Sequence, residues 1–356
     1  MARIGRRTLC YLFAGFTSAF AVPASAQNEA VHIIPRFSFD SGAVLENMRV
    51  GYLTWGQLNE RRDNAILLMP GASGRRNWPS NYVGPGKAFD PERHFIVSVD
   101  PIGGGASSSP ADGMGVDFPQ YTLRDMVRAQ HDLVTKGLGI ERLLAVGGVS
   151  LGAFQGLEWG VTHPGAARGL ILWQGAGRSD RRLHIALDTM LDAITSDPAY
   201  QSGRYSQNPL TGMRLAAQVY TPWFLSDAFF TTLTENVAYD RVRAGLATGL
   251  VRDWDANSYI WRYRAGREYN VAHAHGGDAA RALSRVQARA LVISSSTDRT
   301  VFPDLTLEMV RLLPRAEHHV VENDRGHAAA FQPTDSPIWR VFNERTRAFL
   351  EQLSRD

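Results

Sequence analysis

Short apolar runs, each bounded by glycine-rich or polar loops, recur through the first half and the last quarter of the chain. Such runs are typical of strands in a parallel sheet, and we predict strands over residues 64–69, 94–99, 143–146, 168–173, 290–296 and 319–322. Two alternating segments, residues 31–37 and 48–55, predict an opening hairpin. Apolar residues at helical spacing predict helices over 122–137, 153–163 and 303–313. This order predicts an α/β fold with a mostly parallel central sheet and helices on both faces.

The strand pattern stops between residues 179 and 277, where the chain has helical segments interrupted by Pro, Asn and Gly. We therefore predict a core in two parts, residues 27–178 and 278–356, with a helical cap inserted over the carboxyl edge of the sheet. Large aromatic residues in the insertion either fill its core, which we favour for most of them, or line an acyl-sized pocket. They are Trp223, Phe224, Phe229, Phe230, Trp254, Tyr259, Trp261 and Tyr263.

The first 26 residues have the pattern of a cleaved signal peptide. Arg3, Arg6 and Arg7 form a positive start, residues 9–22 are apolar, and residues 24–26 form a small-residue cleavage site. The apolar stretch is too short and too interrupted for a good membrane span. We expect a periplasmic or secreted mature protein that begins near Gln27 and has no stable membrane anchor. The arginine pair permits the twin-arginine route as well as the general secretory route.

Composition changes this picture in two respects. The chain has 38 Lys and Arg against 35 Asp and Glu, but three of the arginines lie in the signal, so the mature charges balance. This balance gives no support for a nucleic-acid partner. The single cysteine, Cys10, also lies in the signal, which excludes a disulfide framework and a cysteine nucleophile in the mature chain. His273 and His275 have no acidic or cysteine partner at ligand spacing, so we predict neither a metal site nor a cofactor.

The candidate nucleophile is Ser150. It lies in Gly148-Val149-Ser150-Leu151-Gly152, a G-x-S-x-G between a predicted strand and a predicted helix. This is the context of a nucleophile elbow, a strained turn that needs small flanking residues because neighbouring backbone comes close. A serine hydroxyl also requires a base that accepts its proton and a third group that orients the base.

Asp298 and His327 are the candidates for those two roles. Asp298 follows one predicted strand and His327 lies in the loop after the next, so both fall at the edge of the sheet that carries Ser150. The order Ser, Asp, His is that of α/β-hydrolases. The backbone N–H groups of Leu151 and Ala72 are the candidates for an oxyanion hole. An ordinary glycine-rich turn at residues 70–74 is the alternative for Ala72.

Several unusual segments resemble the homoserine O-acetyltransferase family of the α/β-hydrolase superfamily, and the resemblance spans nearly all of the mature sequence. They are residues 50–56, 84–90, 117–130, 148–159, Asp255-Ala256-Asn257-Ser258-Tyr259 and Gly326-His327. The resemblance implies the α/β-hydrolase fold, the helical cap and the Ser150, Asp298 and His327 triad. It also makes a homodimer plausible.

Two departures from that family bear on the substrate. The resemblance implies an aspartate for the homoserine amine directly after the catalytic histidine, where this chain has Ala328. It implies a cap arginine for the homoserine carboxylate at the position of Ala217, and Arg214 on the same helix would face elsewhere. Each missing ion pair would cost on the order of 2–5 kcal/mol.

Export also argues against the acetyltransferase activity of this family, because acetyl-CoA, the acyl donor, is a cytoplasmic metabolite. We therefore predict an exported serine hydrolase that acts on a small ester or acyl compound through an acyl-enzyme. The alternatives are an O-acyltransferase, which uses acetyl-CoA with homoserine or another alcohol, and a binding protein that has kept the fold.

Overall fold

A computed structural model describes residues 27–355, so the predicted signal peptide, residues 1–26, lies outside the described part of the chain. The strands form one sheet in the order β1-β2-β4-β3-β5-β6-β7-β8. β2 is antiparallel to β1 and β4, and the other neighbours are parallel. The strands are β1 (Asn28–Ser38), β2 (Val44–Trp55), β3 (Ala65–Met69), β4 (Phe95–Val99), β5 (Leu143–Val149), β6 (Ala167–Trp173), β7 (Arg289–Ser295) and β8 (Ala316–Val321).

The apolar runs form the central strands because both faces of the sheet are covered. Every residue of β3 is buried. Ile66 and Leu68 pack in one core cluster, while Leu67 and Met69 pack in the other, as the alternation of side chains along a strand requires. The predicted mostly parallel sheet is thus confirmed.

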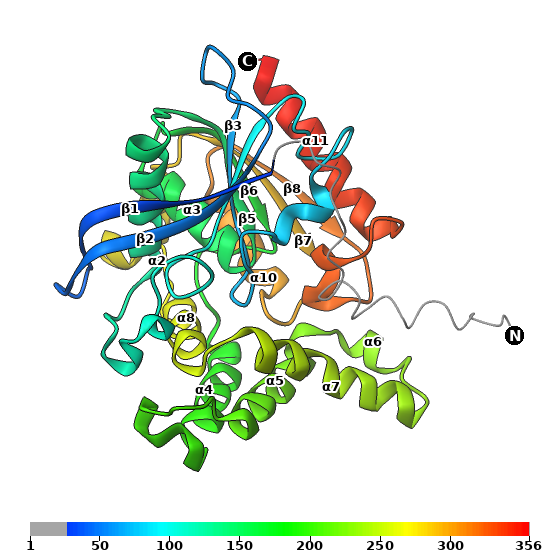
Figure 1. Cartoon of the computed structure of the whole chain (residues 1–356). Helices are drawn as coiled ribbons and strands as arrows, with labels where there is room; N and C mark the ends of the chain where they lie inside the picture. Colours follow the sequence, from blue (N-terminus) through cyan, green and yellow to red (C-terminus); the bar gives the residue numbers. More distant parts are fainter. Residues whose placement is uncertain (1–26, 356) are drawn as a thin grey trace, which may run out of the picture.

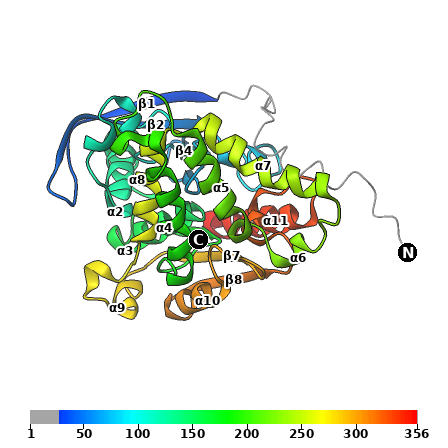
Figure 2. The same ribbon diagram turned by 90° about the horizontal axis from the view of Figure 1, so that it is seen from below.

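Helices cover the two faces of the sheet in separate layers (Figure 1, Figure 2). On one face lie α2 (Leu123–Asp132), α3 (Leu151–Thr162), α9 (Ala279–Leu283) and α10 (Pro303–Leu312). On the other face lies α11 (Pro337–Arg355). Thr122 caps the start of α2 in a capping box, in which it exchanges hydrogen bonds with Asp125.

Five helices of the segment between β6 and β7 lie beneath the sheet, beyond the carboxyl ends of its parallel strands (Figure 1). They are α4 (Arg181–Thr195), α5 (Leu210–Phe224), α6 (Asp227–Phe230), α7 (Asn236–Asp253) and α8 (Ala256–Arg267). We call them the cap. Most of its large aromatic side chains are buried, among them Trp254, Tyr259, Trp261 and Phe229.

Several predicted boundaries are wrong by a few residues. β5 continues to Val149 rather than ending at Val146, because Gly147 and Gly148 still pair with the neighbouring strands. β8 begins at Ala316 and ends before Glu322, and α2 passes at Leu133 into a π-helical turn. α11 was not among the predicted helices. No helix in residues 27–355 is long and apolar enough to cross a membrane.

Candidate active site

Ser150 lies at the turn between β5 and α3, with the rare backbone angles φ 56° and ψ −119°. The two flanking glycines are required by close backbone contacts. A Cβ atom on Gly148 would lie 1.9 Å from the carbonyl oxygen of Met69, and one on Gly152 would lie 2.0 Å from the same oxygen. Strand β3 therefore passes so near the turn that no side chain fits at either position.

His327 links the serine to the aspartate. Its Nε2 lies 2.8 Å from Ser150 Oγ and its Nδ1 lies 2.7 Å from Asp298 Oδ2. The imidazole and the carboxylate are almost completely buried, with side-chain exposures of 2% and 1%. Phe224 of α5 packs edge-on against the imidazole, with ring centres 5.7 Å apart. The structure thus brings together three residues that are far apart in the sequence.

Both carboxylate oxygens of Asp298 accept hydrogen bonds from the protein. Its Oδ1 accepts hydrogen bonds from the backbone N–H groups of Thr300 and Val301, at 2.8 and 2.9 Å. Its Oδ2 accepts from His327 and also from the side-chain amide of Gln174, at 2.8 Å. A carboxylate that accepts several hydrogen bonds is stabilised in its charged form and has one preferred orientation.

The loop after β3 lies close to Ser150. A Cβ atom on Gly71 would be 3.6 Å from the Cβ of Ser150, and Ala72 lines the same pocket as Ser150 and Leu151. Within the described residues, neither the Leu151 nor the Ala72 amide donates a hydrogen bond to the protein. Both residues predicted to supply oxyanion donors therefore line the pocket that contains the serine.

Two side chains of the cap donate hydrogen bonds to the loop after β3. Arg262 of α8 is 1% exposed, and its guanidinium donates hydrogen bonds to the carbonyl oxygens of Ala72, Pro101 and Ile102. The indole of Trp254 donates to the Ser73 carbonyl at 3.2 Å. The cap thereby contributes to the shape of the loop that carries the Ala72 amide.

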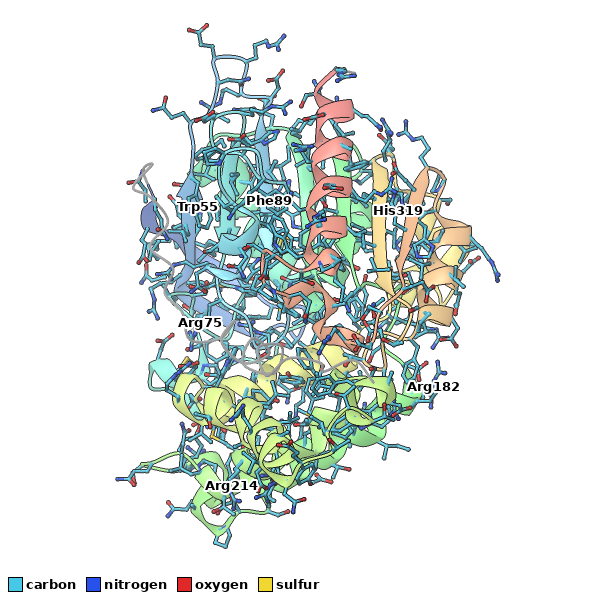
Figure 3. All side chains as sticks on the ribbon, turned by 90° about the vertical axis from the view of Figure 1, so that its right-hand side faces the viewer. Trp55, Arg75, Phe89, Arg182, Arg214 and His319 are labelled. Carbon is cyan, nitrogen blue, oxygen red and sulfur yellow. The ribbon has the colours of Figure 1, made fainter. Side chains whose placement is uncertain are left out.

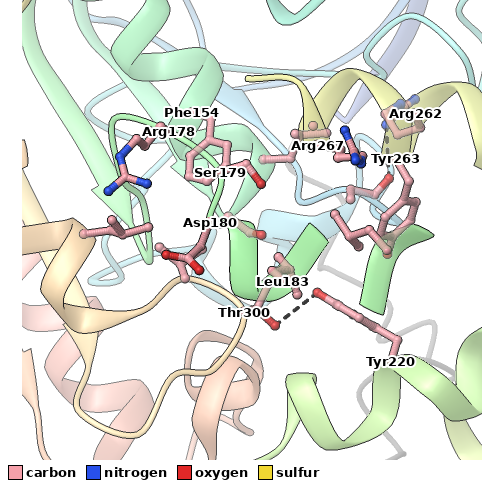
Figure 4. A pocket seen from close by; sticks show the side chains of 17 residues that line it. Phe154, Arg178, Ser179, Asp180, Leu183, Tyr220, Arg262, Tyr263, Arg267 and Thr300 are labelled. Atoms are coloured by element: carbon pink, nitrogen blue, oxygen red, sulfur yellow. Dashed lines mark hydrogen bonds between the residues drawn. The ribbon is translucent and has the colours of Figure 1, made fainter. Parts of the chain in front are cut away.

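The pocket beside Ser150 has a mainly apolar wall, formed by residues such as Phe154, Leu183 and Val301 (Figure 4). Tyr220 and Tyr263 of the cap also line it, and burial raises the pKa of both phenols. The Tyr220 hydroxyl lies 3.2 Å from Thr300 Oγ1. Most cap aromatics pack in the core, as we favoured, and Tyr263 is both buried in the core and part of the pocket wall.

Charged groups at the pocket wall already have protein partners. Asp180 is the one carboxylate among the described lining residues, and hydrogen bonds from Arg182 hold its pKa below the usual value. Arg178 pairs with Glu308 at 3.1 Å. Arg267 pairs with Asp188, which raises the pKa of its guanidinium. The pocket therefore has no uncommitted carboxylate for a substrate amine.

The two alanines that depart from the family pattern are buried and apolar. Ala217 is 4% exposed in α5, and Ala328 packs with Leu225 and Phe229 of the cap. Arg214 is exposed on α5 and lies on the far side of the cap from the sheet (Figure 3). It therefore cannot take the place of an arginine at residue 217.

Sequence reasoning missed Gln174 and Arg262. Both act across contacts with segments that are distant in the chain, so no local motif marks them. The left-handed φ of 50° at Gln174 is a backbone property that its residue type does not signal. Arg262 lies within a predicted helix, where an arginine is most often a surface residue.

A mostly parallel sheet, with a serine on a strand-to-helix turn and an aspartate and histidine at the same edge, defines the α/β-hydrolase class. The family model described as alpha/beta hydrolase fold matches residues 64–334. The chain belongs to this family, and it is an enzyme of the α/β-hydrolase superfamily on a homoserine O-acetyltransferase-like scaffold.

Its relatives include both acyltransferases and esterases. A homoserine O-acetyltransferase of Caulobacter vibrioides is 32% identical over 362 residues, which covers 89% of this chain and 92% of the relative. A Corynebacterium glutamicum protein named Probable esterase Cgl0839 is 32% identical over 327 residues, covering 86% and 92%. The crystal structure of an acetylester hydrolase from Corynebacterium glutamicum superposes with a TM-score of 0.84 at 27% identity, covering 91% and 96%.

Proposed function

We propose that the protein is an exported serine esterase that hydrolyses small acyl esters. The observation that carries this proposal is the continuous chain of hydrogen bonds from Asp298 through His327 to Ser150, which ends in a largely apolar pocket. The similarity to an acetylester hydrolase supports an acetyl ester as the first substrate to test. No cofactor takes part in the proposed chemistry.

The first half of the reaction forms an acyl-enzyme. His327 Nε2 accepts the proton of Ser150 Oγ, and this oxygen attacks the carbonyl carbon of the ester. Asp298 accepts the hydrogen bond from His327 Nδ1, which fixes the tautomer of the ring and stabilises the imidazolium. The Leu151 and Ala72 amides donate hydrogen bonds to the oxyanion. The intermediate collapses when its C–O bond breaks and the leaving alcohol takes the proton from His327.

The second half repeats these steps with water. His327 accepts a proton from the water molecule, which attacks the acyl carbon, and the acid leaves when Ser150 Oγ regains its proton. An alcohol in place of water would give acyl transfer, so the acceptor decides between the two activities. Because the one pocket carboxylate is occupied by Arg182, an acceptor with an amino group gains no ion pair there.

The test is hydrolysis of p-nitrophenyl acetate by the purified mature chain. We expect turnover that Ser150→Ala reduces by about 10⁴-fold or more, since loss of the nucleophile leaves only the binding and oxyanion contributions. Circular dichroism should show that the variant is folded. Equal activity in the variant would contradict the proposal.

An O-acyltransferase is the second candidate, and the 32% identity to a homoserine O-acetyltransferase favours it. Incubation with acetyl-CoA and homoserine, with detection of free CoA, separates the two. Release of CoA that depends on homoserine and exceeds ester hydrolysis would replace the esterase proposal.

The proposed location is the periplasm or the medium, after removal of residues 1–26. The proposed partner is a small ester rather than a nucleic acid or a membrane, and a homodimer is the proposed assembly. Cell fractionation and light scattering of the mature chain test these points.

A further inference from the structure

Gln174 directly follows β6, in the centre of the sheet. It is 1% exposed and has a φ of 50°, in the left-handed region that non-glycine residues seldom adopt. Its backbone N–H donates to the carbonyl of Ile293 in β7 at 2.7 Å. The preceding carbonyl, that of Trp173, accepts the backbone N–H of Ser150 at 2.9 Å. The end of β6 is therefore in contact with the backbone of the proposed nucleophile.

The side chain of Gln174 reaches Asp298 and the backbone of the segment that carries His327. Its Nε2 donates to Asp298 Oδ2 at 2.8 Å, the same oxygen that accepts from His327. The same nitrogen donates to the carbonyl of Gly326 at 3.3 Å. Its Oε1 accepts the N–H of Ala330, also at 3.3 Å. The amide thus binds the carboxylate and both ends of the segment that carries the imidazole.

The backbone conformation of Gln174 has a free-energy cost. A buried non-glycine residue in the left-handed region is strained, and this conformation persists only where its surroundings determine it. A glycine would adopt this backbone conformation without that cost. Three side-chain hydrogen bonds offset it here: one ends at Asp298, and two end at backbone groups of Gly326 and Ala330 on either side of His327.

We propose that Gln174 is a positioning residue for the Asp298 and His327 pair, an inference that rests on the proposed esterase function. Its amide donor fixes Oδ2 of the carboxylate, while its two backbone contacts fix the segment that presents the imidazole to Ser150. Gln174 does not line the pocket. Its loss therefore changes the alignment of the proton acceptor and leaves the binding of the ester unchanged.

The test compares Gln174→Met with wild type. Methionine has a similar length and is apolar, but it neither donates nor accepts a strong hydrogen bond. We expect kcat for p-nitrophenyl acetate to fall roughly 10- to 100-fold, as small misalignments of catalytic groups do, with KM within about twofold. The matched control is Gln130→Met, which removes another buried amide, one bonded to Gln155 and Trp159.

A proton NMR spectrum gives a readout that a purely structural role would not move. The proton between His327 Nδ1 and Asp298 Oδ2 is expected far downfield, and its resonance is assigned by its absence in Asp298→Asn. We expect Gln174→Met to shift or broaden this resonance and Gln130→Met to leave it unchanged. If the methionine variant does not fold, Gln174→Gly serves, because its backbone is compatible with glycine.

The outcomes separate the two proposals. If wild type hydrolyses the ester and the folded Gln174 variant keeps kcat within twofold of Gln130→Met, with an unmoved resonance, the positioning role is wrong. If wild type does not hydrolyse esters, the esterase proposal fails instead. The resonance in Gln174→Met then still decides whether Gln174 orients the pair.

Discussion

At the scale of single residues, the site is shaped by places where side chains cannot fit. The carbonyl oxygen of Met69 lies so close to the turn at Ser150 that Gly148 and Gly152 leave no room for a Cβ atom. The same strand end leads into Pro70 and the loop that carries the Ala72 amide. One backbone oxygen therefore sets the distance between the serine turn and the proposed oxyanion loop.

Replacement of Gly152 by alanine should destabilise the protein and reduce hydrolysis together. The added Cβ would meet backbone atoms, which move less readily than a flexible side chain, and overpacking of this kind costs about 1–3 kcal/mol. Urea unfolding and p-nitrophenyl acetate turnover measure the two effects.

Gly249→Ala is the matched control for this substitution. Gly249 lies within α7 with open space around its Cβ position, so alanine should stabilise the helix by up to about 1 kcal/mol. A Gly152→Ala variant as stable and active as Gly249→Ala would show that the backbone contact is unimportant.

At the scale of elements, α3 is unusual because it is buried on every side, from Leu151 to Val161. Its one acidic residue, Glu158, is 6% exposed, and burial raises the pKa of its carboxyl to about 7. Arg124 partly opposes this rise, while Asp40 adds to it. The helix that begins at the nucleophile thus contains a carboxyl group that is easily protonated.

We expect Glu158→Gln to stabilise the protein at alkaline pH. In the folded state the Glu158 carboxyl keeps its proton up to about pH 7, whereas in the unfolded chain it loses the proton near the ordinary pKa of 4.5. The free energy of unfolding therefore falls as pH rises between these two values. The glutamine variant avoids a loss of roughly 3 kcal/mol. Urea unfolding at pH 4 and pH 8 measures it, with a difference from wild type only at pH 8.

The exposed Glu141 supplies the control for this experiment. Glu141→Gln should follow the wild-type dependence on pH. A Glu158→Gln variant that is no more stable than wild type at pH 8 would mean that interactions in the folded protein stabilise the buried carboxylate of Glu158.

At the scale of the whole molecule, the parallel sheet brings the site residues together and the cap covers them. β5, β7 and β8 all end at the edge that faces the cap, so the loops after them carry Ser150, Asp298 and His327 to one place. The cap then adds Phe224 against the imidazole and Arg262 against the loop of Ala72. The sheet assembles the nucleophile and its base, while the cap shapes the surrounding pocket.

A chain that consists of residues 27–356 should fold and hydrolyse esters as well as the full-length chain does. The described fold begins with β1 at Asn28, which pairs along its length with β2. Urea unfolding and turnover of this chain provide the comparison.

Mass spectrometry of the protein from the periplasm or medium should find an N-terminus near Gln27, and retention of residues 1–26 would contradict the signal-peptide prediction.

The sequence by itself determined the features that depend on local pattern. Buried parallel strands need continuous apolar runs, so β3, β4, β5 and β6 were predictable to within a few residues. The serine turn was predictable because its glycines, preceding strand and following helix are neighbours in the chain. The order Ser150, Asp298, His327 indicated a common edge, since each follows a strand of one parallel sheet.

Only the tertiary structure decided which side chains support these groups. Gln174 contacts residues 124 and 152 positions away, and Arg262 reaches carbonyls more than 150 positions away. Likewise, only the packing of the elements places Asp180 in the wall of the pocket beside Ser150. Such contacts depend on the packing of whole elements against one another, and neither residue type nor spacing records that packing.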